Sequence, residues 1–106
     1  MTLRLSRLRD FFQIAELLER QGIELDELER ARLTRFDPRS RVVICATALV
    51  AAHETVIGVG AIDIDGDRIT EPTLVVVDEQ MTDGLGELIS NALVGRARTL
   101  AAARAA

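Results

Sequence analysis

The sequence predicts an α+β domain made of two N-terminal helices, a three-stranded antiparallel sheet and a C-terminal amphipathic helix. Three observations lead to this prediction. Apolar residues recur at helical spacing near the start of the chain, β-branched apolar runs separated by short polar turns fill its middle, and helical spacing returns at its end. A chain of 106 residues is long enough for one such domain with a modest core, and too short for two.

The two N-terminal helices are predicted over Leu5–Arg20 and about Glu24–Arg35. Gly22 is expected to end the first helix in the left-handed conformation that glycine adopts readily. Asp37-Pro38 is expected to end the second, because proline disfavours the helical conformation in the residue before it. The residues predicted to share one face are Leu5, Leu8, Phe11, Phe12, Ala15, Leu17 and Leu18 in the first helix, and Leu25, Leu28, Arg32 and Leu33 in the second.

The first predicted strand, Arg41–Val50, is β-branched and apolar on both faces. Such a strand is typical of the centre of a sheet that is covered on both sides. Residues Ala51 to Thr55 are predicted to form a short connection to the returning strand, Val56–Ile64. Two glycines within that strand, Gly58 and Gly60, indicate a bulge or the close approach of another segment.

A turn is predicted at Asp65-Gly66-Asp67, and the third strand, Thr73–Val77, follows Pro72. The last helix is predicted over about Asp83–Ala101, and the alanine-rich tail 102–106 is expected to fray. Its apolar stripe consists of Leu85, Leu88, Ile89, Ala92, Leu93, Arg96, Ala97 and Leu100.

Composition narrows the classes of function. The net charge is −4, all 13 basic residues are arginine, and the nine that precede Val42 are interleaved with eight acidic residues. Nucleic-acid binding depends on clustered positive charge, so we expect no nucleic-acid partner. The longest apolar run, Val42 to Ala52, is about half as long as a membrane helix, and we expect no membrane partner. The single cysteine fits a reducing, cytoplasmic location, and arginine without lysine is typical of a high-GC bacterial genome.

The most informative motif is a glycine turn between the third strand and the last helix. A strand, a glycine turn and a helix N-terminus commonly hold a phosphate, because free backbone N–H groups converge there. The structural alternative is that Asp83 caps the helix and Glu87 suits its first turn without any ligand. The candidate cofactor-binding residues are Met81, Thr82, Asp83, Gly84, Leu85, Gly86 and Glu87.

Four other features are weaker candidates for chemistry. Asp78 and Glu79 follow the third strand, where a general base is one interpretation, although neighbouring strand residues point to opposite faces. Cys45 lies within an apolar strand and is expected to be an inert core residue, and His53 is expected to lie in a loop. Three alternating aspartates resemble the start of a calcium loop, but the pattern favours a solvated turn: Asp63, Asp65 and Asp67.

The predicted order of elements, together with the strand–turn–Gly-x-Gly–helix unit, resembles the N-terminal part of the GNAT acyltransferase superfamily. In that family a strand leads into a pyrophosphate loop of the pattern Gln/Arg-x-x-Gly-x-Gly/Ala and then into an amphipathic helix. When the glycines are aligned on Gly84 and Gly86, the Gln/Arg position falls on Met81, and Gln80 lies one residue out of register.

The resemblance extends over nearly the whole chain. Leu5–Arg20 is similar to the family's first helix, and the strands Arg41–Val50 and Val56–Ile64 are similar to its second and third strands. The family has a further strand and helix after the loop helix, and that later helix often supplies a tyrosine as the acid. This chain has no tyrosine. The resemblance therefore implies a truncated relative, or half of a site that a partner completes.

Two classes of function follow from the resemblance. The first is a non-catalytic or degenerate GNAT-like module that self-associates or docks on a partner protein. The second is an acetyl-CoA-dependent N-acetyltransferase whose site is completed across a dimer or by a partner chain. The acceptor substrate is not indicated in either case.

Self-association is predicted from the third strand. Leu74–Val77 would form an apolar edge that no Lys or Arg interrupts, and such an edge invites pairing with another chain. The apolar stripe of the last helix also looks larger than a three-stranded sheet can cover. We therefore expect a two-fold homodimer, formed by strand pairing, helix packing or exchange of elements.

Overall fold

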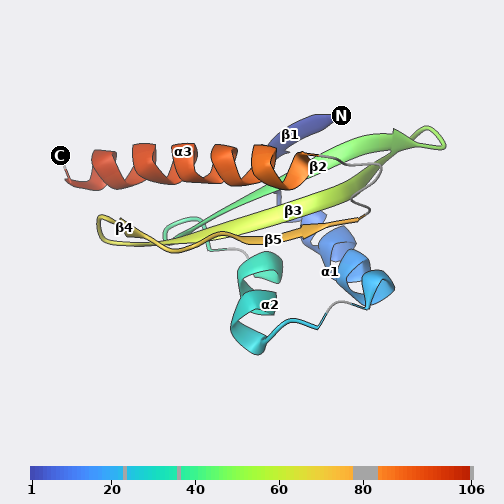
Figure 1. Ribbon diagram of the computed structural model, residues 1–106, viewed down its shortest axis with the longest axis horizontal. Coiled ribbons are helices and arrows are strands. Elements are labelled where there is room, and N and C mark those ends of the chain that lie inside the picture. The colour runs from blue at the N-terminus through green and yellow to red at the C-terminus, as the bar shows by residue number, and fades with distance from the viewer. Residues whose placement is uncertain (23, 36, 78–83, 106) are drawn as a thin grey trace.

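The computed structural model describes residues 1–22, 24–35, 37–77 and 84–105. It has three layers, in which a curled antiparallel sheet separates a long C-terminal helix from two shorter helices (Figure 1). In chain order the elements are β1 (Thr2–Leu5), α1 (Asp10–Gln21), α2 (Glu27–Thr34), β2 (Arg41–Val50), β3 (His53–Asp65), β4 (Arg68–Ile69), β5 (Thr73–Val76) and α3 (Leu85–Ala105).

The sheet confirms the predicted antiparallel pairing and is larger than predicted. Its order is β1-β2-β3, and both β4 and β5 pair with β3. The pairing of the third predicted strand with the second is confirmed, since Val75 lies opposite Val59. The prediction of three strands is wrong, because β1 and β4 add two more. β4 has only two residues, which is too short for any periodic pattern to be visible.

The N-terminal segment is where the prediction fails most clearly. Residues Thr2 to Leu5 form a strand that pairs with β2, and α1 begins only at Asp10. Leu3 and Leu5 alternate with polar residues, which is strand spacing, but Leu5 and Leu8 also fit a helical spacing. The helix was therefore predicted too early. The buried apolar face of α1 consists of Phe11, Ile14, Leu17 and Leu18, whereas Leu8 and Phe12 are exposed.

Two apolar cores lie on opposite faces of the sheet, which confirms the prediction that the Arg41–Val50 strand is covered on both sides. Alternate residues of β2 belong to different cores. Val43 and Cys45 face α1 and α2, whereas Val42 and Ile44 face α3. Leu33 is the fully buried residue of α2, while Leu28, predicted on the same face, is largely exposed. On α3 the buried row is Leu85, Ile89, Leu93, Ala97 and Ala101.

The two glycines of β3 mark both features that the sequence indicated. A bulge interrupts the β2–β3 register, since Ala46 lies opposite Gly58 but Thr47 lies opposite Val56. The helix α3 also approaches closely, because a methyl group at Gly60 would lie 2.7 Å from Cγ2 of Ile89. Glycine is therefore required where the helix crosses the strand.

The chain turns where the sequence indicated, with one difference. Gly22 caps α1 with φ of 59°, and Gly66 turns from β3 into β4 with φ of 64°. The β2–β3 connection is shorter than predicted. It consists of Ala51 and Ala52, which have φ of 50° and 66°, so His53 already belongs to β3 and the expectation that it lies in a loop is wrong. Positive φ at both central residues is the geometry of the tightest hairpin turn.

Candidate functional site

The predicted cofactor loop is described only in part. Met81, Thr82 and Asp83 lie outside the described residues, as do Asp78, Glu79 and Gln80. The four remaining members of the predicted set, from Gly84 to Glu87, lie at the start of α3, where that helix follows β5 in the chain.

Within this turn Gly84, Leu85 and Glu87 have separate roles. Gly84 has φ of 76°, and its carbonyl accepts a hydrogen bond from the N–H of Leu88 at 3.1 Å. The side chain of Leu85 is 1% exposed and belongs to the core, so it anchors the helix to the sheet. The side chain of Glu87 is exposed in the first turn, where a carboxylate interacts favourably with the helix dipole.

Gly86, like Gly95 in the same helix, is not fixed as glycine by its surroundings. Neither a positive φ nor a steric conflict requires glycine there, because a methyl group would lie 4.0 Å from Cγ2 of Val76. Glycine in a helix costs about 0.5–1 kcal/mol relative to alanine. The first turn of α3 therefore has open space beside its backbone at Gly86.

The weaker candidates for chemistry are explained by the fold. Cys45 is buried in the core of β2, as expected, and burial raises the pKa of its thiol. Asp65 belongs to β3 and Asp67 to the turn that follows Gly66. Over the described parts of the chain, no three His, Cys, Asp or Glu side chains converge closely enough to hold a metal ion.

An ion-pair cluster centred on the buried Asp10 joins β1, α1 and β3, and no pattern in the sequence indicated it. Arg4 donates two hydrogen bonds to the carboxylate of Asp10, at 2.7 and 3.0 Å, and two to Oε1 of Glu54, at 2.7 and 3.1 Å. The backbone N–H of Arg7 also donates to Asp10, at 2.6 Å. Asp10 is 3% exposed, and these bonds, chiefly those from Arg4, hold its pKa below the ordinary value. The cluster fixes the start of α1 against the sheet.

A second cluster ties α2 to the sheet. The carboxylate of Asp63 accepts hydrogen bonds from Arg32 at 2.9 Å and from Arg41 at 2.6 Å. Arg41 also donates to the carbonyl of Ala31, at 3.2 Å. Arg41 and Asp63 lie directly opposite each other in the β2–β3 register, so the hairpin pattern could have indicated this pair. Both clusters pair their charges internally, which is typical of structural sites.

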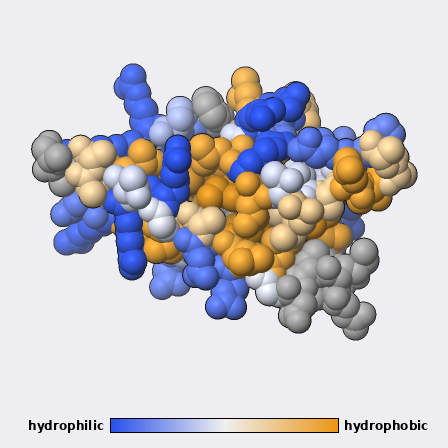
Figure 2. All heavy atoms as spheres, turned by 90° about the horizontal axis from the view of Figure 1, so that it is seen from above, coloured by the Kyte–Doolittle hydropathy of each residue, from blue (hydrophilic) through white to orange (hydrophobic). Residues whose placement is uncertain are grey.

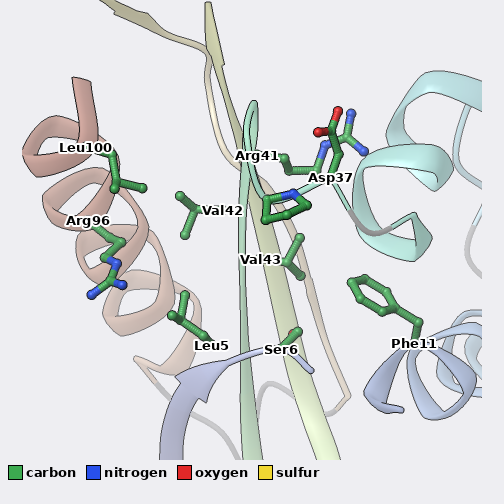
Figure 3. A pocket seen from close by; sticks show the side chains of 10 residues that line it. Leu5, Ser6, Phe11, Asp37, Arg41, Val42, Val43, Arg96 and Leu100 are labelled. Carbon is green, nitrogen blue, oxygen red and sulfur yellow. The ribbon is translucent and has the colours of Figure 1, made fainter. Parts of the chain in front are cut away.

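A cavity of about 230 Å³ opens at the edge of β2, between α3 and the α1–α2 layer (Figure 3). Its apolar lining includes Leu5, Val42 and Leu100 on the α3 side, and Phe11 and Val43 on the other side. The polar lining consists of Ser6, Asp37, Arg41 and Arg96. The sequence did not predict this cavity, because the cavity forms where β1 ends and β1 was not predicted.

The outer edge of β5 is the second open feature. β5 pairs with β3 on one side, and among the described residues no strand pairs with it on the other. Leu74 is 37% exposed, and no residue from Thr73 to Val76 is charged.

On the face of the molecule that carries α3, hydrophobic residues gather over the middle and at the tip of the β2–β3 hairpin (Figure 2). The end of that hairpin exposes Leu49 and Val50.

No helix among the described residues is long and apolar enough to cross a membrane. A scan of protein-family models and a search of curated proteins each gave no match to this chain.

Proposed function

We propose that this chain is a non-catalytic or degenerate GNAT-like module that self-associates through the outer edge of β5, or docks there on a partner protein. The unpaired edge is the observation that supports this proposal most directly. In an antiparallel pair only alternate residues bond to a given neighbour, so half of the backbone groups of β5 point away from β3. These groups offer hydrogen bonds to a further strand.

A second copy of the chain is the partner that β5 itself favours. An antiparallel pair of β5 strands would have two-fold symmetry, because each copy presents the same uncharged strand to the other. The half-exposed side chain of Leu74 would pack beside its symmetry mate. The stripe on α3 contributes less than the sequence suggested, because Leu85, Ile89 and Leu93 are already fully buried by the chain's own sheet. Strand pairing is therefore favoured over helix packing.

Light scattering over a range of micromolar concentrations tests this proposal. We expect a species of twice 11.6 kDa that Val76→Arg and Leu74→Lys both shift to the monomer. Val50→Arg is the matched control, because Val50 is 52% exposed but lies at the hairpin tip, away from β5. Far-UV circular dichroism shows whether each variant keeps its fold. A monomer at every concentration, or equal effects of Val50→Arg and Leu74→Lys, would refute self-association through β5.

The alternative function is an acetyl-CoA-dependent acyltransferase completed by a second chain. The observation that favours it is Gly86, where the backbone of the first helical turn is open although packing does not require glycine. Against it, Glu87 and, in the sequence, Asp83 bring negative charge to a position that would receive a pyrophosphate. We expect calorimetry to detect weak binding of acetyl-CoA or none. A low-micromolar dissociation constant that Gly84→Glu abolishes would favour the acyltransferase over the non-catalytic module.

A further inference from the structure

We propose that the cavity at the edge of β2 binds an extended peptide segment that carries an acidic residue between apolar ones. The peptide would continue the sheet beyond the point at which β1 ends. This site is separate from the outer edge of β5, which lies on the other side of β3, and does not depend on the function proposed above.

The backbone of β2 is open at this point. β1 pairs with β2 only as far as Leu5 opposite Ile44, and the N–H of Ser6 then donates to the carbonyl of Val43 at 2.8 Å. Among the described residues no strand pairs with β2 on this side at Arg41, which lines the cavity. The backbone groups of Val42 point towards β3 instead, because successive residues of a strand bond to opposite sides and Val43 bonds to Ser6. An added strand would supply the missing hydrogen bonds, which is how sheets recognise extended peptides.

The α3 side of the cavity selects an anion, because its charged residue is Arg96, whereas the carboxylate of Asp37 lies on the other side, beside Arg41 (Figure 3). Arg41 is already bonded to Asp63, and Asp37 accepts a hydrogen bond from the hydroxyl of Ser40, which lowers the pKa of Asp37. Arg96 is exposed, and among the described residues no carboxylate pairs with it. Arg96 is thus the cation left for a ligand, and an acidic side chain is its natural partner.

The spacing of the lining residues fits an extended chain. Figure 3 shows Leu100 and Arg96 one above the other on α3, beside the strand that carries Val42. Four residues of helix span about 6 Å, and residues i and i+2 of a strand are about 6.7 Å apart on one face. A peptide could therefore place an apolar side chain against Leu100 and an acidic one, two residues later, against Arg96. The residues between them would face Phe11 and Val43.

Fluorescence anisotropy with a labelled peptide Val-Leu-Val-Glu-Val, blocked at its C-terminus as an amide, tests this proposal. We expect saturable binding that Arg96→Glu weakens by about tenfold or more and that Arg96→Lys largely restores. Arg98→Glu is the matched control, since Arg98 is exposed on the same helix but does not line the cavity. A peptide with lysine in place of glutamate should bind the Arg96→Glu variant more tightly than it binds the unchanged protein.

Two further measurements separate this site from other modes of binding. A peptide methylated on alternate backbone nitrogens should lose binding, because it cannot donate to the strand edge. Val76→Arg should bind the unmodified peptide as tightly as the unchanged protein does. The proposal is overturned if no peptide saturates, if the methylated peptide binds equally well, if Arg96→Glu and Arg98→Glu have equal effects, or if Val76→Arg abolishes binding.

Discussion

Gly60→Ala is the substitution that tests the packing of α3 against the sheet most directly. The added methyl group would lie 2.6 Å from Cδ2 of Leu74 and 2.7 Å from both Cγ2 of Ile89 and Cδ1 of Leu93. Ordinary contacts between carbon atoms are about 3.5–4.0 Å, so all three neighbours must move. Leu74 can turn outward, because it is partly exposed. Ile89 and Leu93 are fully buried, and the Cγ2 methyl of Ile89 is fixed to its own Cβ.

We expect Gly60→Ala to lower the free energy of unfolding by about 1–2 kcal/mol. Overpacking of a well-packed core typically costs about 1–3 kcal/mol. Alanine lowers the conformational entropy of the unfolded chain, and this offsets about 0.4–1 kcal/mol of the overpacking cost. Gly58→Ala should cost less, because its methyl group would lie 3.1 Å from Cδ1 of Ile89 and 3.2 Å from Cδ2 of Leu85, which are the ends of flexible side chains.

Urea unfolding followed by far-UV circular dichroism, at one fixed protein concentration, measures these differences. Gly95→Ala is the control for the chemistry of the substitution, because nothing lies within 4 Å of its added methyl group and the residue is within a helix. It should stabilise the protein by about 0.5–1 kcal/mol. Adding Leu74→Ala to Gly60→Ala should recover part of the stability that Gly60→Ala loses, because it removes one of the three close neighbours. If Gly60→Ala is as stable as Gly58→Ala, the close approach of α3 is not as described.

Two further predictions concern the hairpin turn and the buried ion pair. Replacing Ala51-Ala52 with Asn-Gly should raise the free energy of unfolding by about 1–2 kcal/mol, because these residues tolerate positive φ at both positions, and thermal unfolding would measure it. Arg4→Met should lower stability by about 3 kcal/mol at neutral pH, because it leaves the Asp10 carboxylate buried without its ion-pair partner, whereas Glu54→Gln should cost much less, because Glu54 is exposed. The pKa of Asp10 is lowered in the folded state, so the stabilisation by the pair is complete above the unfolded pKa near 4 and is lost as the pH falls through the folded value. Denaturant titrations at descending pH should show the difference between Arg4→Met and the unchanged protein shrinking, and a constant difference would contradict this assignment.

The sequence predicted the parts of the fold whose pattern has one interpretation. The strand Arg41–Val50 is apolar on both faces and has no helical alternative, and Gly22 and Gly66 mark turns that need positive φ. The prediction failed where a short segment fits both the helical and the strand spacing of apolar residues, as at Leu5. It also failed where a segment is too short to show any spacing, as at Arg68–Ile69. The ion pair of Arg4 with Asp10 could not be predicted, because it depends on the placement of β1 beside α1. The cavity lined by Arg96 could not be predicted either, because it forms where β1 ends and so also depends on the placement of β1.

The two outer edges of the sheet differ in a way that favours β5 for association. β1 is short, and its Arg4 is held by Asp10 and Glu54, so a fixed charge stands beside that edge. Charged residues and short strands are the usual means by which proteins protect an edge from pairing. β5 is equally short, but it has no charge. A further chain that adds to this sheet should therefore add at β5, or at the stretch of β2 that β1 leaves uncovered, where Arg96 selects for an acidic segment. The two proposed contacts thus depend on separate features of the fold: one is the uncharged outer edge of β5, and the other is the part of β2 that β1 leaves uncovered on the opposite side of the sheet.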